Sequence, residues 1–200
     1  MLISRIFKRV EGPRCRLFTK KAHFSNMRKS NVIVYWLVPA KPERELFREL
    51  IRILAKQFEA PRFEPHLTLV AIADDGRAPR EILPQIHAPP IHLGVRGIGS
   101  SSRFTKTLFA RFKSSKSLEK LVVDLGRELR KRTKSVRDPH VSLLYKTLPK
   151  RVKKELVSTI KLPFEEVTFD FIQAVRSALP IRDGSDVKAW KVVAKKRLSG

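Results

Sequence analysis

The sequence predicts an α+β fold that contains two similar halves. Two stretches, "PHLTL" at 65–69 and "PHVSL" at 139–143, share the pattern Pro-His-apolar-hydroxyl-Leu. Each follows a hydrophobic strand and an amphipathic helix in the same order along the chain. Because strands backed by helices bury one common core, the repeated order indicates an internal duplication in which each half contributes one copy of the motif.

Regular structure is expected to begin abruptly in the first half. "NVIVYWLVP", residues 31–39, is rich in β-branched and aromatic residues and predicts a buried strand. From Pro42 to Phe58, apolar residues recur at helical spacing with charges between them, which predicts an amphipathic helix. Residues 61–72, "PRFEPHLTLVAI", predict an extended strand, and 79–87 predict a short helix.

The rest of the chain continues the alternation of strands and helices. Apolar runs predict five strands, over 90–101, 104–112, 138–145, about 164–176 and 187–194. Helical spacing predicts two helices, over 115–131 and 150–159. The second half therefore repeats the order of strand, helix and motif strand.

The composition is strongly basic and suits a soluble protein with a real core. The formal charge is +24, from 43 Lys and Arg against 19 Asp and Glu. Such a charge attracts polyanions, of which nucleic acid is the commonest, although a solvated basic surface is the simpler interpretation. No apolar run approaches the roughly 20 residues that span a bilayer. The single cysteine, Cys15, excludes an intrachain disulfide and a cysteine zinc site, so we expect a cytoplasmic protein.

The N-terminal residues differ from the rest of the chain. Residues 1–30 contain nine Lys and Arg, with Glu11 as the one acid, and they lack the apolar segment of a secretory signal. A transit peptide, a polyanion-binding tail and an incorrectly assigned start codon are three open interpretations. Because the scattered apolar residues can bury little surface, we expect a disordered tail before a domain over 31–198.

The two motifs place their polar side chains on one side of each strand. Residues two apart in a strand share a face, so His66 projects with Thr68, and His140 projects with Ser142. The apolar residues between them point the other way, into a core. If the halves face each other, two imidazoles and two hydroxyls meet in one cleft.

This set of groups suits hydrolysis of a phosphodiester. The reaction needs a base for water and an acid for the leaving oxygen, and two histidines that titrate near neutrality can divide these roles. The hydroxyls can donate to the charged phosphorane. No carboxylate cluster suggests a Mg²⁺ site, so we expect neither a metal nor a cofactor. The other histidines, His23, His87 and His92, lack a comparable strand context and are interpreted as structural or exposed.

The paired His-x-[Thr/Ser]-x motifs resemble the 2H phosphoesterase superfamily, and within it the cyclic phosphodiesterase family. The resemblance covers roughly residues 31–198. The matching segments are "YWLVP" at 35–39, "APRFEPHLTL" at 60–69, "HVSLLY" at 140–145 and "VKAWKVV" at 187–193.

The resemblance implies a fold and a reaction. The fold would be two pseudo-symmetric lobes, each with an antiparallel sheet backed by helices, with the active-site cleft between them. The family opens ADP-ribose 1″,2″-cyclic phosphate and nucleoside 2′,3′-cyclic phosphates to phosphomonoesters without a metal. Its catalytic histidines correspond to His66 and His140, and its phosphate-binding hydroxyls to Thr68 and Ser142. We assign His140 as base and His66 as acid, although the near-symmetry of the motifs leaves this order open.

Aromatic residues of the family's cleft correspond to Trp36, Phe109 and Tyr145. They could stack a base, but ordinary core packing is the other interpretation and is equally favoured for Phe109. Trp190 is interpreted as structural.

Three other functions stay open. The basic charge suits an RNA 2′,3′-cyclic phosphate end, as in 2′-5′ RNA ligase-like proteins. The basic block at 127–137, before the second motif, could guide an RNA backbone toward the cleft, but a solvated helix face is the simpler interpretation of it. A non-catalytic RNA-binding protein with a similar cleft is a second alternative, and a metal-dependent phosphodiesterase is the third. We expect a monomer that binds a nucleotide or ADP-ribose cyclic phosphate, and no membrane.

Overall fold

The structure is a computed structural model that describes residues 29–76 and 78–199. The predictions about Cys15, His23 and most of the basic N-terminal segment lie outside these residues. Within them, no helix combines the length and the apolar character needed to cross a membrane.

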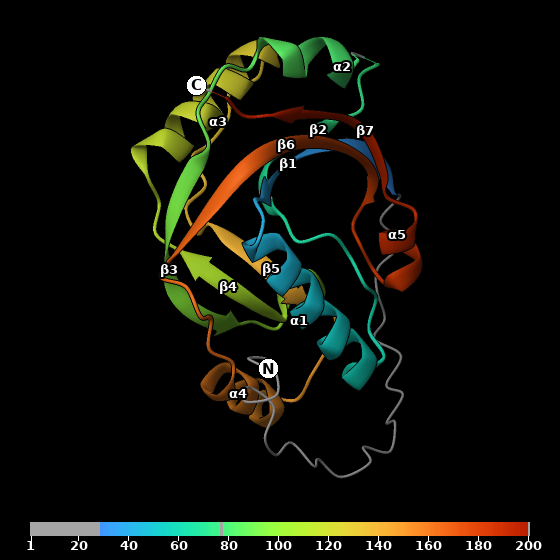
Figure 1. Ribbon diagram of the computed structural model, residues 1–200. Coiled ribbons are helices and arrows are strands. Elements are labelled where there is room, and N and C mark those ends of the chain that lie inside the picture. The colour runs from blue at the N-terminus through green and yellow to red at the C-terminus, as the bar shows by residue number, and fades with distance from the viewer. Residues whose placement is uncertain (1–28, 77, 200) are drawn as a thin grey trace.

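The described residues contain one connected sheet of seven strands, and every neighbouring pair of strands is antiparallel. Their order is β2-β1-β6-β3-β4-β5, with β7 paired to β6. Figure 1 shows the long β6 arching across the molecule with β7 beside it. The bounds are Ser30–Pro39 for β1, Leu67–Ala73 for β2, Ile91–Ser100 for β3, Leu108–Phe112 for β4, His140–Leu144 for β5, Glu166–Leu179 for β6 and Lys191–Arg197 for β7.

Helices cover the sheet on several sides. The α-helices are α1 (Glu43–Phe58), α2 (Pro79–Ile82), α3 (Lys116–Glu128), α4 (Lys150–Thr159) and α5 (Gly184–Lys188). Two 3-10 turns, η2 at Leu83–Gln85 and η3 at Phe104–Lys106, connect other elements. α1 packs against β5, α2 lies against β7, and α4 contacts β3 and β4 (Figure 1). The predicted antiparallel α+β fold is therefore confirmed.

The alternation of the motif strand β2 is visible in its burial. Leu67 and Leu69 are buried, whereas Thr68 between them is exposed. In β5, Val141 and Leu143 are fully buried in the same hydrophobic core. Burying a side chain of this size stabilises the fold by roughly 1.5–3 kcal/mol, so the apolar residues of each motif fix the direction in which the polar ones point.

Three predicted strand segments differ from the structure. Residues 61–66 have no regular structure, because Pro61 and Pro65 have no N–H to donate to a ladder. Residues 104–106 form η3 rather than the start of β4. Residues 184–188 form α5, because the Asp183 carboxylate accepts hydrogen bonds from the backbone N–H groups of Ser185 and Asp186 and caps a helix.

The sheet combines strands from both halves of the chain. β6 and β7 come from the second half, yet β6 pairs with β1 along ten residue pairs. β3 links the two parts of the sheet, since Ile91–Gly94 pair with β6 and the following residues pair with β4. The motif strands β2 and β5 stand at the two ends of the strand order, and they lie against each other in space. This closure brings the two motifs together.

Candidate active site

The two motifs meet at a cavity of about 310 Å³. His66, Thr68, His140 and Ser142 all line it, so the structure brings together the four polar residues that the sequence singled out. His66 immediately precedes β2, and His140 is the first residue of β5. The cleft expected between the two motifs is present.

Both histidines are held in the same tautomer by the same backbone contact. Nδ1 of His66 lies 2.6 Å from the carbonyl oxygen of Glu64, and Nδ1 of His140 lies 2.7 Å from that of Asp138. A carbonyl oxygen can only accept, so each Nδ1 must carry the proton and donate it. Nε2 of each neutral imidazole is then an acceptor, and it becomes a donor when the ring is protonated.

Aromatic rings enclose His66. The Trp36 ring stacks on the imidazole with centroids 3.7 Å apart and planes 13° apart, and Trp190 meets it edge-on at 5.8 Å. Phe63 lies on a further side, at 6.4 Å. Burial lowers the pKa of His66 to about 4, assisted by the charge of His140 and opposed by the hydrogen bond to the Glu64 carbonyl. His66 is therefore neutral at physiological pH in the free protein.

His140 has a more polar environment. Burial is the main cause that lowers its pKa, and nearby Lys106 lowers it further. The hydrogen bond to the Asp138 carbonyl and the Asp138 carboxylate both raise it. Phe109 packs edge-on against the imidazole, with centroids 5.3 Å apart. The two histidines are thus chemically different despite matching backbone contacts.

The His66 environment predicts a measurable dependence of stability on pH. Its folded pKa of about 4 lies below the ordinary value of about 6.5. The unfolded chain therefore binds more protons in this window, so the stability from neutral His66 is present above about pH 6.5 and is lost as the pH falls toward 4. Replacing His66 with Gln should flatten this part of the curve in urea unfolding, and NMR should give a titration midpoint near 4 in the wild type. A titration midpoint near the ordinary pKa of about 6.5 would contradict the burial of His66 among the aromatic rings.

The hydroxyls of Thr68 and Ser142 differ in exposure and in hydrogen bonding. Thr68 is exposed, and its hydroxyl makes no hydrogen bond within the described residues. Ser142 is buried, and its Oγ donates to the backbone carbonyl of Thr105 at 2.9 Å. Thr68 can donate to a ligand directly, whereas Ser142 must first turn its hydroxyl proton away from Thr105.

Of the three aromatic residues predicted to line the cavity, two do so and the third packs against a histidine. Trp36 and Tyr145 line the cavity, and Tyr145 stacks on Phe63 with centroids 3.9 Å apart. Phe109 is not part of the lining and instead packs edge-on against His140. Trp190, interpreted from sequence as structural, does line the cavity and packs edge-on against Trp36 at 5.0 Å.

Gly99 of β3 pairs with Phe109 of β4, and the absence of a side chain at Gly99 leaves room for the Phe109 ring. A Cβ at Gly99 would lie 2.8 Å from the Phe109 ring. We expect Gly99→Ala to cost about 1–3 kcal/mol of unfolding free energy through overpacking, and to move the ring that packs against His140. The control is Gly94→Ala in the same strand, where the nearest atom is Lys113 Cδ at 3.4 Å. Equal urea stability of the two variants would contradict this packing argument.

Sequence reasoning missed two cations at the cavity. Arg103 and Lys106 line it from the connection between β3 and β4. Lys106 Nζ lies 2.6 Å from the Asp138 carboxylate and 4.4 Å from the centre of the Phe109 ring. No spacing relates these cations to either motif, so only the folded chain reveals them.

An acidic residue stands two positions before each histidine, Glu64 before His66 and Asp138 before His140. Glu64 forms a two-pronged ion pair with Arg48 of α1, at 2.7 and 2.9 Å. Asp138 pairs with Lys106, which with Arg111 lowers the pKa of its carboxyl. In each motif, the acidic residue that forms the ion pair also accepts, through its backbone carbonyl, the hydrogen bond from Nδ1 of the histidine. These ion pairs therefore fix the segments that orient the two histidines.

The described residues contain no group of three or more His, Cys, Asp or Glu that could hold a metal ion. The cavity wall instead offers imidazoles, hydroxyls, two cations and aromatic rings.

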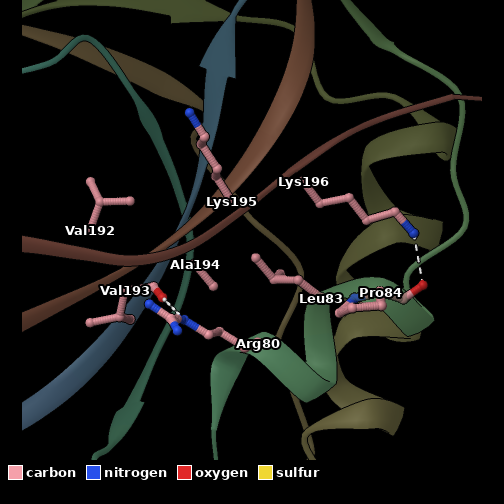
Figure 2. A pocket seen from close by; sticks show the side chains of 8 residues that line it. All are labelled: Arg80, Leu83, Pro84, Val192, Val193, Ala194, Lys195 and Lys196. Atoms are coloured by element: carbon pink, nitrogen blue, oxygen red, sulfur yellow. Dashed lines mark hydrogen bonds between the residues drawn. The ribbon is translucent and has the colours of Figure 1, made fainter.

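A larger groove, of about 690 Å³, lies elsewhere, between β7 and the segment of α2 and η2. Figure 2 shows two of its three cations reaching backbone oxygens, since Arg80 Nε donates to the carbonyl of Val193 and Lys196 Nζ donates to that of Pro84. The contact from Arg80 satisfies a backbone carbonyl of the edge strand β7. No histidine lines this groove, so its greater size does not make it the better candidate for catalysis.

Comparison with known proteins places the fold. No protein-family model and no curated protein sequence matches this sequence. Among solved structures, Escherichia coli LigT in complex with 3′-AMP matches with a TM-score of 0.53 and 16% identity, over 86% of this chain and 100% of LigT. A structure described as a phosphoesterase matches with a TM-score of 0.51 and 16% identity, over 85% of this chain and 99% of that one. A Thermus thermophilus protein matches with a TM-score of 0.50 and 19% identity, over 84% of this chain and 98% of that one. This chain therefore has the same fold as LigT and the phosphoesterase structure.

Proposed function

We propose that this protein is a 2H phosphoesterase that hydrolyses cyclic phosphodiesters on ribose to phosphomonoesters, without a metal ion. The substrates are nucleoside 2′,3′-cyclic phosphates, ADP-ribose 1″,2″-cyclic phosphate, or both. The observation that supports this most is the pair of imidazoles at one cavity, each with Nδ1 held by a backbone carbonyl. LigT, which shares the fold, was solved with 3′-AMP, a phosphomonoester of the kind proposed as product.

Hydrolysis of the cyclic phosphate requires a base that takes a proton from water and an acid that gives a proton to the leaving ribose oxygen. The Nε2 atom of one histidine accepts a proton from water as the water oxygen bonds to phosphorus. The other histidine, protonated at Nε2, donates its proton to the ribose oxygen as the bond from that oxygen to phosphorus breaks. The hydroxyls of Thr68 and Ser142, together with Lys106, stabilise the negative charge on the non-bridging oxygens.

The environments of the two histidines favour the reverse of the order assigned from the sequence. His66 is buried among aromatic rings and stays neutral, which suits a base that must accept a proton. Burial also lowers the pKa of His140, but the Asp138 carboxylate opposes that shift and no carboxylate does so for His66, so His140 is the more readily protonated of the two. We therefore assign His66 as the base and His140 as the acid.

The test is to incubate the purified protein with a nucleoside 2′,3′-cyclic phosphate in EDTA and follow phosphomonoester release. Turnover in EDTA supports the proposal. Turnover only after Mg²⁺ is restored would favour a metal-dependent phosphodiesterase. Tight RNA binding without turnover would favour the non-catalytic RNA-binding alternative.

The charge of +24 favours an RNA 3′ end as a second candidate substrate. A panel of mononucleotide, ADP-ribose and RNA-end cyclic phosphates compares these candidates. The panel should be repeated after removing residues 1–28 and no more, because Lys29 pairs with buried Asp186 and Ser30 pairs with Leu179 in the sheet. Loss of rate on RNA alone would indicate that the basic segment contacts RNA.

A further inference from the structure

The cationic part of the cavity wall comes from a single loop. Among the described residues, the Lys and Arg side chains that line the cavity are Arg103 and Lys106, both in the connection between β3 and β4. The wall around His66 is instead aromatic, with Trp36 and Trp190 against the imidazole. A bound ligand therefore meets positive charge on the side of this loop.

Several hydrogen bonds hold the backbone of the loop in place, and three of them involve serine hydroxyls. Ser101 Oγ donates to the carbonyl of Lys106 at 2.6 Å and accepts from the N–H of Arg103 at 3.2 Å. Ser142 Oγ donates to the carbonyl of Thr105 at 2.9 Å. Arg103 itself is exposed, so a fixed main chain presents a side chain that can reach a ligand.

The charges around the loop are unbalanced. Lys106 and Arg111 share the Asp138 carboxylate, at 2.6 and 3.6 Å. No ion pair to Arg103 exists within residues 29–76 and 78–199. Arg111 does not line the cavity, so the cations of the wall are Arg103 and Lys106. Lys106 already has the Asp138 carboxylate as its partner, which leaves Arg103 as the cation available to a further anion.

We infer that Arg103 binds a second phosphate, on the 5′ carbon of the ribose whose cyclic phosphate is opened. The inference rests on the proposed function and specifies its substrate. With the cyclic phosphate at the histidines, hydroxyls and Lys106, the 5′ phosphate is the next anion along the same ribose. Its oxygens match the planar fork of a guanidinium. An RNA end, a 5′-phosphorylated mononucleotide and ADP-ribose cyclic phosphate all have this group, and a nucleoside cyclic phosphate with a free 5′ hydroxyl does not.

The experiment compares kcat/KM for adenosine 2′,3′-cyclic phosphate with and without a 5′ phosphate. The wild type should prefer the 5′-phosphorylated substrate by about tenfold, since a hydrogen-bonded ion pair of roughly 1.5 kcal/mol corresponds to that ratio. Arg103→Gln should reduce the ratio to about one, mainly through KM. Arg151→Gln removes the same charge from exposed α4 and should keep the wild-type ratio. Cyclic-phosphate-ended dinucleotides and ADP-ribose cyclic phosphate then show which source of the 5′ phosphate is preferred.

Equal rates on the two substrates in the wild type, or an unchanged ratio in Arg103→Gln, would overturn the inference while leaving cyclic phosphate hydrolysis standing. If neither substrate is hydrolysed, the proposed function fails and binding still tests Arg103. Both tryptophans of the chain, Trp36 and Trp190, line the cavity, so their fluorescence can report binding of adenosine 3′-phosphate and adenosine 3′,5′-bisphosphate. Tighter binding of the bisphosphate that Arg103→Gln abolishes supports the inference, and equal binding overturns it.

Discussion

Replacing either His66 or His140 with Gln should lower kcat on a nucleoside 2′,3′-cyclic phosphate by about 10²–10⁴-fold, the usual effect of losing a general acid or base. Glutamine keeps much of the imidazole volume, which matters for His66 because Trp36 stacks on it at 3.7 Å. It cannot exchange a proton with water or with the leaving oxygen. Initial rates under saturating substrate measure the effect.

The double variant should be little worse than either single one. The base and the acid act on the same reaction, so removing one already loses most of what the pair provides. His92→Gln is the matched control, because His92 is exposed on β3 and contacts Thr168 and Glu166 away from the cavity. Full activity of both single variants would end the two-histidine mechanism, provided that urea unfolding shows all the variants folded.

Removing the Thr68 hydroxyl should lower kcat by about 10²–10³-fold, as expected for a donor to a developing anion. Thr68→Val keeps the shape of the side chain, and the hydroxyl has no partner among the described residues to lose. Its stability should therefore stay within about 0.5 kcal/mol of the wild type. Thr168→Val, at a hydroxyl that bonds His92 outside the cavity, is the control for kinetics.

Ser142→Ala should behave differently from Thr68→Val. It removes a donor to the phosphate, and it also leaves the Thr105 carbonyl without the hydrogen bond that Ser142 gives it. Thr105 is half-buried, so losing this hydrogen bond should cost about 0.5–1.5 kcal/mol, and this variant should lose both kcat and unfolding free energy. A Thr68→Val variant with wild-type kcat would remove Thr68 from the mechanism, whatever Ser142→Ala shows.

The local geometry of the motifs was predictable because it depends on neighbours in sequence. Strand parity places Thr68 opposite in direction to Leu67 and Leu69, and the burial pattern of β2 follows it. The helix at 150–159 was also placed correctly, since its apolar spacing is local. The strand predicted over 61–72 begins only at Leu67 in the structure, because Pro61 and Pro65 have no N–H to donate to the ladder.

Residue patterns alone were enough to predict the two motifs, the pairing of an imidazole with a hydroxyl in each, and most of the strands and helices around them. How the two histidines differ depends on tertiary packing. Trp190 lies far along the chain from His66, and Arg103 and Lys106 reach the cavity through a turn that no periodicity marks. The pKa of a histidine and the charge of a cavity depend on which groups surround them in space. The groups around each histidine depend on the tertiary arrangement, in which β6 lies between β1 and β3 and β2 lies against β5. No local sequence pattern specifies that arrangement.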